Sequence, residues 1–170
     1  MPDQRKKFSQ IYDRYIDKIY RFVFFKVNSK DIAEDLTSET FLKIWKVFQN
    51  DDQEIENMQA FLYRTARNLV IDYYRIKGKN QTMSVEHAYL LDPRQDLEEN
   101  AKLNSDIENI KQVLVNLKED YQNVIIWYYL DDLPIPKIAK LLDRTEDATR
   151  VLLHRALESV RLKIDQVGKV

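Results

Sequence analysis

The sequence contains no cysteine, and its 170 residues include only 2 histidines, 2 glycines and 4 prolines. Without cysteine there is no disulfide and no thiolate metal site, and His87 and His154 are too few for a histidine-built metal site. We therefore expect neither a metal nor another cofactor. The shortage of glycine and proline leaves little material for hairpin turns, whereas Leu, Ile, Lys, Glu and Gln favour helices. The sequence predicts an all-α protein.

Long apolar runs are missing as well. No stretch approaches the length needed to span a bilayer, and the charged N-terminal segment 1–7 is not followed by an apolar signal core. Hydrophobic residues still make up 44% of the chain and aromatic residues 11%, which is enough for buried cores. We expect a soluble cytoplasmic protein that does not insert into a membrane.

The charge is nearly balanced overall but is divided along the chain. The formal net charge of -1 excludes a uniformly basic protein, so any contact with nucleic acid must come from local patches. Residues 61–79 and 137–163 are rich in Lys and Arg, and residues 80–109 between them are rich in Asp and Glu. The chain therefore consists of a basic, an acidic and a second basic block.

Apolar residues that recur every three or four positions predict three helices in the first half of the chain. The first covers residues 8–27, and the second begins after a capping residue, Ser29. The third covers about residues 57–77 and ends near Gly78. We assign residues 4–78 to one helical domain.

The helical pattern fails after this domain and then returns. Residues 79–104 are acidic and largely lack periodicity, which predicts a linker. Ser105 and Glu108 have the spacing of a capping box in a further helix, whose start can lie several residues earlier. We assign residues 105–166 to a second domain. The predicted architecture is two small all-α domains joined by an acidic linker.

The second domain ends with the pattern of a helix-turn-helix. In residues 133–156 a short helix is followed by a turn and a second helix, for which Thr145 offers a cap. On that helix Ala148 and either Leu152 or Val151 are spaced to pack inward. The remaining polar face, which suits phosphates and base edges, consists of Arg144, Thr145, Thr149, Arg150, His154 and Arg155. A helical hairpin with solvated arginines is the alternative.

The predicted third helix interleaves aromatic and basic residues. Arginines neutralise phosphates and aromatic rings stack on unpaired bases, so this composition suits single-stranded nucleic acid. Phe61 and Tyr73 fall on the apolar stripe, which leaves Tyr63 and Tyr74 as candidate stacking rings. The candidate contacts are Tyr63, Arg64, Arg67, Asn68, Tyr74 and Arg75. An amphipathic helix with a solvated basic face is the alternative.

The start of the predicted second helix is acidic, with Asp31, Glu34, Asp35 and Glu39. Acids in a first turn commonly complement the helix dipole, and an acidic surface can also dock a basic partner. A hydrolase would need such carboxylates paired in a cleft with a metal or a shifted pKa. Nothing else in the sequence supports that third reading.

Taken together, three segments resemble the extracytoplasmic-function (ECF) group of the sigma-70 family, the bacterial initiation factors of RNA polymerase. Residues 31–45 are similar to the family's polymerase-binding helix, and residues 61–75 to its helix for the melted minus-ten element. Residues 114–161 are similar to its C-terminal domain, whose helix-turn-helix, of winged-helix-like type, reads the duplex minus-thirty-five element. The resemblance implies docking on the polymerase β′ clamp. The matching positions are Asp31, Asp35, Ser38, Glu39 and Phe41.

The resemblance also implies the partners, which are core RNA polymerase through its β′ clamp and β flap, promoter DNA, and an anti-sigma factor. It implies a factor that recognises a two-part promoter, helps to open it and catalyses nothing itself. The alternative is a stand-alone helix-turn-helix regulator that binds duplex DNA as a dimer without polymerase. Asp147, near the DNA, would repel phosphate unless it accepts from a cytosine amino group or only complements the helix dipole.

Overall fold

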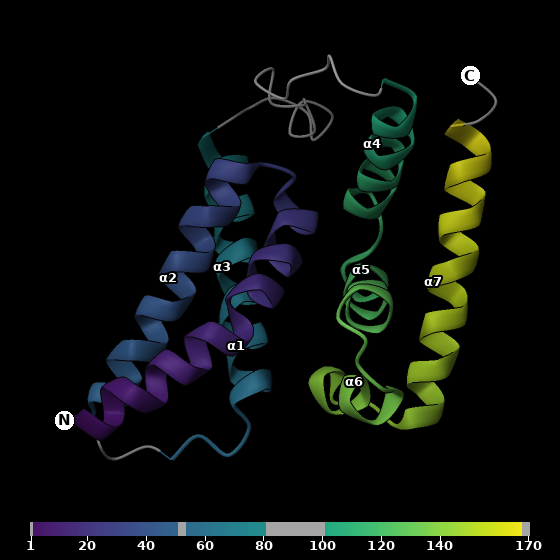
Figure 1. The fold of residues 1–170 in the computed structure, drawn as a ribbon. Coiled ribbons are helices and arrows are strands. Elements are labelled where there is room, and N and C mark those ends of the chain that lie inside the picture. Colours follow the sequence, from purple (N-terminus) through teal and green to yellow (C-terminus); the bar gives the residue numbers. More distant parts are fainter. Residues whose placement is uncertain (1, 51–53, 81–100, 168–170) are drawn as a thin grey trace. The chain divides into compact units, whose positions relative to one another are not determined.

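The structure is a computed structural model that describes residues 2–50, 54–80 and 101–167 (Figure 1). The chain divides into two compact units, Met1–Ser84 and Val85–Val170. Within the described ranges the regular elements are all helices, and no strand, and so no wing, is present there. The prediction of an all-α chain with two small helical units is confirmed. None of the helices in these ranges is long and apolar enough to cross a membrane.

The N-terminal unit is a bundle of three helices, α1 (Pro2–Val27), α2 (Lys30–Gln49) and α3 (Met58–Asn80), each packed on the other two (Figure 1). Burying one large apolar side chain, such as that of Ile, Leu, Val or Phe, stabilises a fold by about 1.5–3 kcal/mol. Its fully buried apolar side chains come from all three helices and include Ile19, Phe22, Val23, Ile44 and Leu62. The core therefore fixes the faces that the helices leave exposed.

The turn between α1 and α2 orients the start of α2. Asn28 takes a left-handed conformation with φ 49°, which asparagine tolerates better than most residues. The backbone N–H of Ile32 donates to the Ser29 hydroxyl oxygen at 3.5 Å, so Ser29 caps α2 as predicted. At the start of α3, the Ala60 N–H donates to the Asn57 side-chain oxygen at 3.0 Å in the same way.

Helix α3 ends at Asn80, two residues beyond Gly78, near which its end was predicted. Gly78 does not take a positive φ, and a Cβ at this position would meet nothing within 4 Å. A glycine inside a helix costs about 1 kcal/mol relative to alanine but does not end the helix unless the chain needs a left-handed residue there. Gly78 therefore lowers the stability of the helix locally but does not end it.

The C-terminal unit contains α4 (Ala101–Val115), α5 (Glu119–Ile125), the π-helical turn η2 (Ile126–Leu130), α6 (Ile135–Leu142) and α7 (Glu146–Val167). The long helix α7 packs against α4, α5 and α6 (Figure 1). Fully buried apolar side chains in this unit include Val124, Ile126, Ile138 and Ala156. This core holds the short α6 against the first half of α7.

The expected linker lies mostly outside the described residues. Its ends do not: Lys79 and Asn80 belong to α3, and residues 101–104 belong to α4. Helix α4 begins at Ala101, so the earlier start that the sequence allowed is confirmed, and Ser105 lies inside the helix and does not cap it. The domain boundaries 4–78 and 105–166 remain predictions.

The turn between α6 and α7 has the geometry of a helix-turn-helix. Helix α6 ends at Asp143, which has φ 53°, and the Arg144 N–H donates back to the Ala139 carbonyl at 3.0 Å. Pro136 occupies the first turn of α6, where its missing N–H has no intrahelical acceptor to lose. The Ala148 N–H donates to the Thr145 hydroxyl oxygen at 3.1 Å, so the predicted cap of α7 is confirmed.

Candidate docking and nucleic-acid surfaces

One side of the first half of α2 is acidic and exposed. We call it the acidic edge. It consists of Asp31, Glu34, Asp35, Ser38 and Glu39, all of which are exposed. Leu42, itself 51% exposed, continues this side toward the C-terminus. A catalytic carboxylate pair needs a cleft that excludes water, whereas these side chains lie at the surface of the helix. Across the ranges that the structure describes, no group of His, Cys, Asp or Glu could hold a metal ion.

Phe41 does not belong to the acidic edge, which corrects one predicted contact. Its side chain is only 3% exposed, and its ring lies 4.9 Å from the Tyr12 ring and 6.5 Å from the Phe8 ring of α1. Such edge-to-face contacts add to the stabilisation from burial. Phe41 therefore holds α2 against α1 and positions the edge from beneath.

An open apolar groove lies beside the acidic edge and was not predicted from the sequence. Its volume is about 430 Å³, and it is formed by α1 and α2. Tyr12 is 41% exposed and Leu42 is 51% exposed within it, so the groove presents apolar surface to solvent. Its lining consists of Arg5, Phe8, Tyr12, Ser38, Phe41, Leu42 and Trp45. The available signal was Leu42, an apolar residue among the polar positions of an amphipathic helix.

Helix α3 presents charged and amide side chains but not the ring of Tyr63. Arg64, Asn68 and Arg75 are exposed and Arg67 is half-buried, as a nucleic-acid surface requires. Arg75 also forms an ion pair with Asp72 at 3.6 Å.

Tyr63 and Tyr74 were predicted to stack on bases, and the structure corrects Tyr63, whereas the stacking role of Tyr74 stays a prediction. Tyr63 is 2% exposed, and its ring packs edge-to-face on Phe22 at 5.2 Å. Tyr74 is half-buried, and its hydroxyl donates to the backbone carbonyl of Lys26. The buried face of α3 is wider than the apolar stripe, because a tyrosine can bury its ring and still satisfy its hydroxyl.

On α7 the predicted environments of two neighbouring residues, Ala148 and Thr149, are reversed in the structure. Thr149, predicted to contact DNA, is fully buried, and its hydroxyl donates to the Thr145 carbonyl at 2.8 Å. Ala148, predicted to pack inward, is exposed, and so is Val151. The buried stripe consists of Thr149, Leu152 and Ala156. Adjacent helical positions differ by about 100°, so a small error in the helix phase moves a residue from one face to the other.

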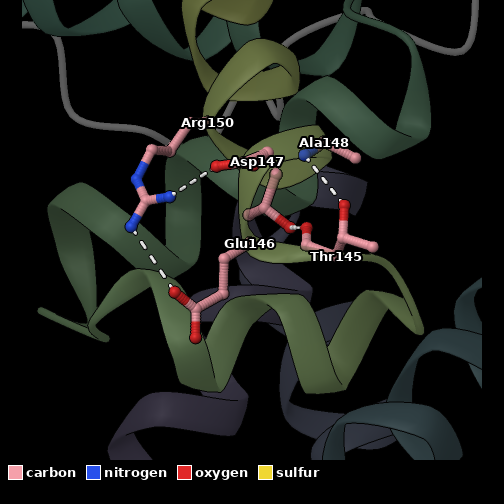
Figure 2. A network of polar contacts seen from close by, with 6 residues as sticks. Thr145, Glu146, Asp147, Ala148 and Arg150 are labelled. Atoms are coloured by element: carbon pink, nitrogen blue, oxygen red, sulfur yellow. Dashed lines mark hydrogen bonds and ion pairs between the residues drawn. The ribbon is translucent and has the colours of Figure 1, made fainter.

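We call the exposed charged surface in the first half of α7 the mixed-charge face. It consists of Glu146, Asp147, Arg150, His154, Arg155 and Glu158. Figure 2 shows Arg150 between the two acids of the first turn: Nη1 lies 3.0 Å from Asp147 Oδ1, and Nη2 lies 3.5 Å from Glu146 Oε2. The His154 Nε2 atom lies 3.2 Å from Glu158 Oε1. Several groups that could meet DNA therefore have carboxylate partners within the protein.

Arg144 and Thr145 lie in the turn that precedes α7. Arg144 Nη2 is 2.7 Å from Asp120 Oδ2, which ties this turn to the start of α5. Exposed ion pairs of this kind contribute about 0–1 kcal/mol, so a phosphate can replace the carboxylate. Thr145 uses its hydroxyl to cap α7, as Figure 2 shows.

Comparison with known proteins matches both units to parts of one family. The model of Sigma-70 region 2 matches residues 11–80, and that of Sigma-70 region 4 matches residues 107–160. The ECF RNA polymerase sigma factor BldN of Streptomyces coelicolor is 28% identical over 158 residues, 90% of this chain and 58% of the relative. The ECF RNA polymerase sigma factor SigW of Bacillus subtilis is 27% identical over 166 residues, 92% of this chain and 88% of the relative. The chain belongs to the sigma-70 family, as a member of its ECF type.

Solved structures agree with this fold. The sigma factor RpoE of Bartonella quintana, in complex with the anti-sigma factor NepR, has a TM-score of 0.67 at 20% identity. That likeness covers 94% of this chain and 98% of the other. CnrH, in complex with the cytosolic domain of CnrY, also has a TM-score of 0.67, at 18% identity. At this level of identity the likeness concerns the fold.

Proposed function

We propose that this chain recruits core RNA polymerase to promoters and reads a two-part promoter, with one element for each helical unit. The observation that carries the proposal is the pairing, in one chain, of the exposed acidic edge of α2 with a capped helix-turn-helix in the second unit. A regulator that binds only DNA does not need an acidic docking surface, and a protein that binds only polymerase does not need a DNA-reading helix. The combination favours a chain that does both.

The acidic edge of α2 is the proposed contact with the β′ clamp. Asp31, Asp35, Ser38 and Glu39 are exposed on the same part of the helix, and a basic partner surface would be attracted to their charge. The apolar groove beside them can add contact area through Tyr12. A protein that covered the same surface would compete with polymerase, which is how an anti-sigma factor would act on this chain.

Helix α3 is the proposed surface for the opened minus-ten strand. Arg64, Arg67, Asn68 and Arg75 can neutralise phosphates and bond to base edges of an unpaired strand. Strand opening then follows from binding, because unpaired bases offer contacts that a duplex does not. Tyr63 supports this surface from within the bundle, and half-buried Tyr74 remains a candidate stacking ring at its edge.

Helix α7 is the proposed reader of the duplex minus-thirty-five element. In a helix-turn-helix the N-terminal part of the second helix enters the major groove, which brings Arg150, His154 and Arg155 toward base edges and phosphates. Arg144 in the preceding turn can reach the DNA backbone once it leaves Asp120. We assign the β flap as the partner of this unit. We propose that polymerase carries out RNA synthesis and that the chain acts through binding.

Run-off transcription with purified core polymerase on a randomised promoter library tests this function. We expect transcripts that require the chain and that start downstream of a shared two-part sequence. Absence of chain-dependent initiation would contradict the proposal. Tight binding of the chain alone, as a dimer, to duplex DNA would instead support the stand-alone regulator.

A further inference from the structure

The mixed-charge face of α7 is unusual for a surface that approaches DNA, because its acids outnumber its arginines. Glu146, Asp147 and Glu158 are exposed beside Arg150 and Arg155. Sequence-independent binding to DNA grows with the number of phosphates that a protein neutralises. This face therefore attracts DNA weakly unless the DNA offers something other than phosphate.

The geometry at the start of α7 shows how this balance acts on Arg150. Its guanidinium is shared between Asp147 at 3.0 Å and Glu146 at 3.5 Å, both in the first turn (Figure 2). The Asp147 side chain is 97% exposed, so burial does not hold it in place. A phosphate that approached this guanidinium would also meet the negative charge of both carboxylates.

We propose that Asp147, assisted by Glu146, is a specificity-determining residue for duplex DNA. Its carboxylate repels phosphate oxygens and keeps Arg150 from the DNA backbone, so the Arg150 guanidinium changes its carboxylate partner only for a base edge. This change is favourable at a guanine, whose O6 and N7 accept two of the guanidinium N–H groups, while Asp147 accepts from the N4 amino group of a cytosine. The DNA under the first turn of α7 therefore contains a G·C pair.

This inference rests on the proposed function, because it assumes that α7 faces promoter DNA. A simpler role for the same residues exists, since acids in a first turn complement the helix dipole and pair with basic residues three or four positions later. The two roles differ in what happens when the charge is removed. A purely local role leaves the choice between DNA sequences unchanged, whereas a specificity role reduces it.

The test compares wild-type chain with Asp147→Asn, each bound to core polymerase, because asparagine keeps the size and one acceptor oxygen and replaces the charged oxygen by a neutral NH2 group. The probes are a promoter duplex selected by the wild-type holoenzyme and a duplex of equal composition whose minus-thirty-five region is shuffled. We expect affinity for the shuffled duplex to rise about threefold to tenfold in Asp147→Asn, with a salt slope steeper by about one unit. The ratio of the two affinities should fall about tenfold.

Two further variants sharpen this test. Glu146→Gln should act in the same direction but less, because its contact with Arg150 is longer. Asp165→Asn makes the same charge change at an exposed position of α7 about 27 Å along the helix, and it should leave the ratio unchanged.

The inference is overturned if Asp147→Asn changes both affinities by the same factor, or if Asp165→Asn lowers the ratio equally. The failure of the proposed function is a different result. In that case the wild-type holoenzyme itself does not distinguish the two duplexes, and both claims fall together.

Discussion

The acidic edge of α2 and the mixed-charge face of α7 carry charge in opposite ways. On the edge, acids follow each other along half of a helix, and Glu34 lies 4.0 Å from Lys30, whereas on the face Arg150 and His154 lie 3.0–3.5 Å from carboxylates. A surface of one sign attracts an oppositely charged partner from a distance and loses strength with salt. A surface of paired charges attracts little and discriminates between partners at contact. The difference suits a protein partner in one unit and a DNA sequence in the other.

Removing the Tyr63 ring tests whether the first unit works through its charges or through its aromatic rings. We expect Tyr63→Ala to lower the free energy of unfolding by about 3–5 kcal/mol, because the ring fills the core against Phe22. Denaturant unfolding measures this loss. The exposed neighbour Arg64→Ala should change it by less than about 0.5 kcal/mol. An unchanged stability with lost binding to single-stranded DNA would make Tyr63 a stacking residue after all.

Reversing the acidic edge is the most direct way to break the comparison. Asp35→Lys combined with Glu39→Lys should weaken binding to core polymerase by about 2–4 kcal/mol, because like charges then face each other. The melting temperature should stay close to that of the wild type, since exposed charges contribute little to stability. Equilibrium titration with labelled polymerase measures the affinity. The matched control reverses Asp13 and Asp17, an exposed pair of equal spacing on α1. Equal losses in both double variants, or none in either, would remove the edge from the interface.

Arg150→Ala tests whether the mixed-charge face of α7 contacts a base or a phosphate. If Arg150 reads a guanine, promoter affinity of the holoenzyme should fall by about 1–3 kcal/mol, and the loss should vanish when that G·C pair is replaced by A·T. Binding isotherms at several salt concentrations separate this from a phosphate contact, which would weaken all duplexes alike and lower the salt slope. Arg161→Ala, farther along the same helix, is the control. Isotherms identical to those of the wild type would exclude Arg150 from the surface.

Thr145→Ala tests the helix cap that holds the start of α7 and with it the mixed-charge face. Loss of the cap should destabilise the C-terminal unit by about 1 kcal/mol, because the Ala148 N–H loses its acceptor. Thr145→Ser keeps the hydroxyl and should retain both stability and promoter affinity. Thermal unfolding of the full chain and the same binding assay measure the two effects. Lost promoter affinity in Thr145→Ser at full stability would make the threonine methyl group a DNA contact.

Local features of this chain were predictable because local chemistry determines them. The caps at Ser29 and Thr145 depend on a hydroxyl three residues before an unpaired N–H, and this spacing is visible in the sequence. The helix-turn-helix followed from the same logic, and the exposed acids of α2 followed from their place opposite an apolar stripe. The all-α fold was predictable from the shortage of glycine and proline.

The remaining features depend on contacts between elements. Whether Phe41 and Tyr63 face the core depends on how α1 packs against α2 and α3, which the helical period alone does not determine. The pairing of Arg144 with Asp120 joins residues 24 positions apart. The exchange of Ala148 and Thr149 shows the same limit on a smaller scale, because threonine can be buried once its hydroxyl bonds to the preceding turn.

The central claim is that the first unit binds polymerase and the second reads the DNA sequence. Multi-template transcription tests it most directly, with core polymerase and three chains: the wild type, the edge-reversed chain (Asp35→Lys with Glu39→Lys) and Arg150→Ala. The templates are promoters selected by the wild-type holoenzyme, together with versions whose minus-thirty-five element is shuffled. We expect the edge-reversed chain to lose initiation on every template, and Arg150→Ala to lose it only where the minus-thirty-five element is intact. Normal initiation by the edge-reversed chain, or an equal loss on all templates with Arg150→Ala, would contradict the account.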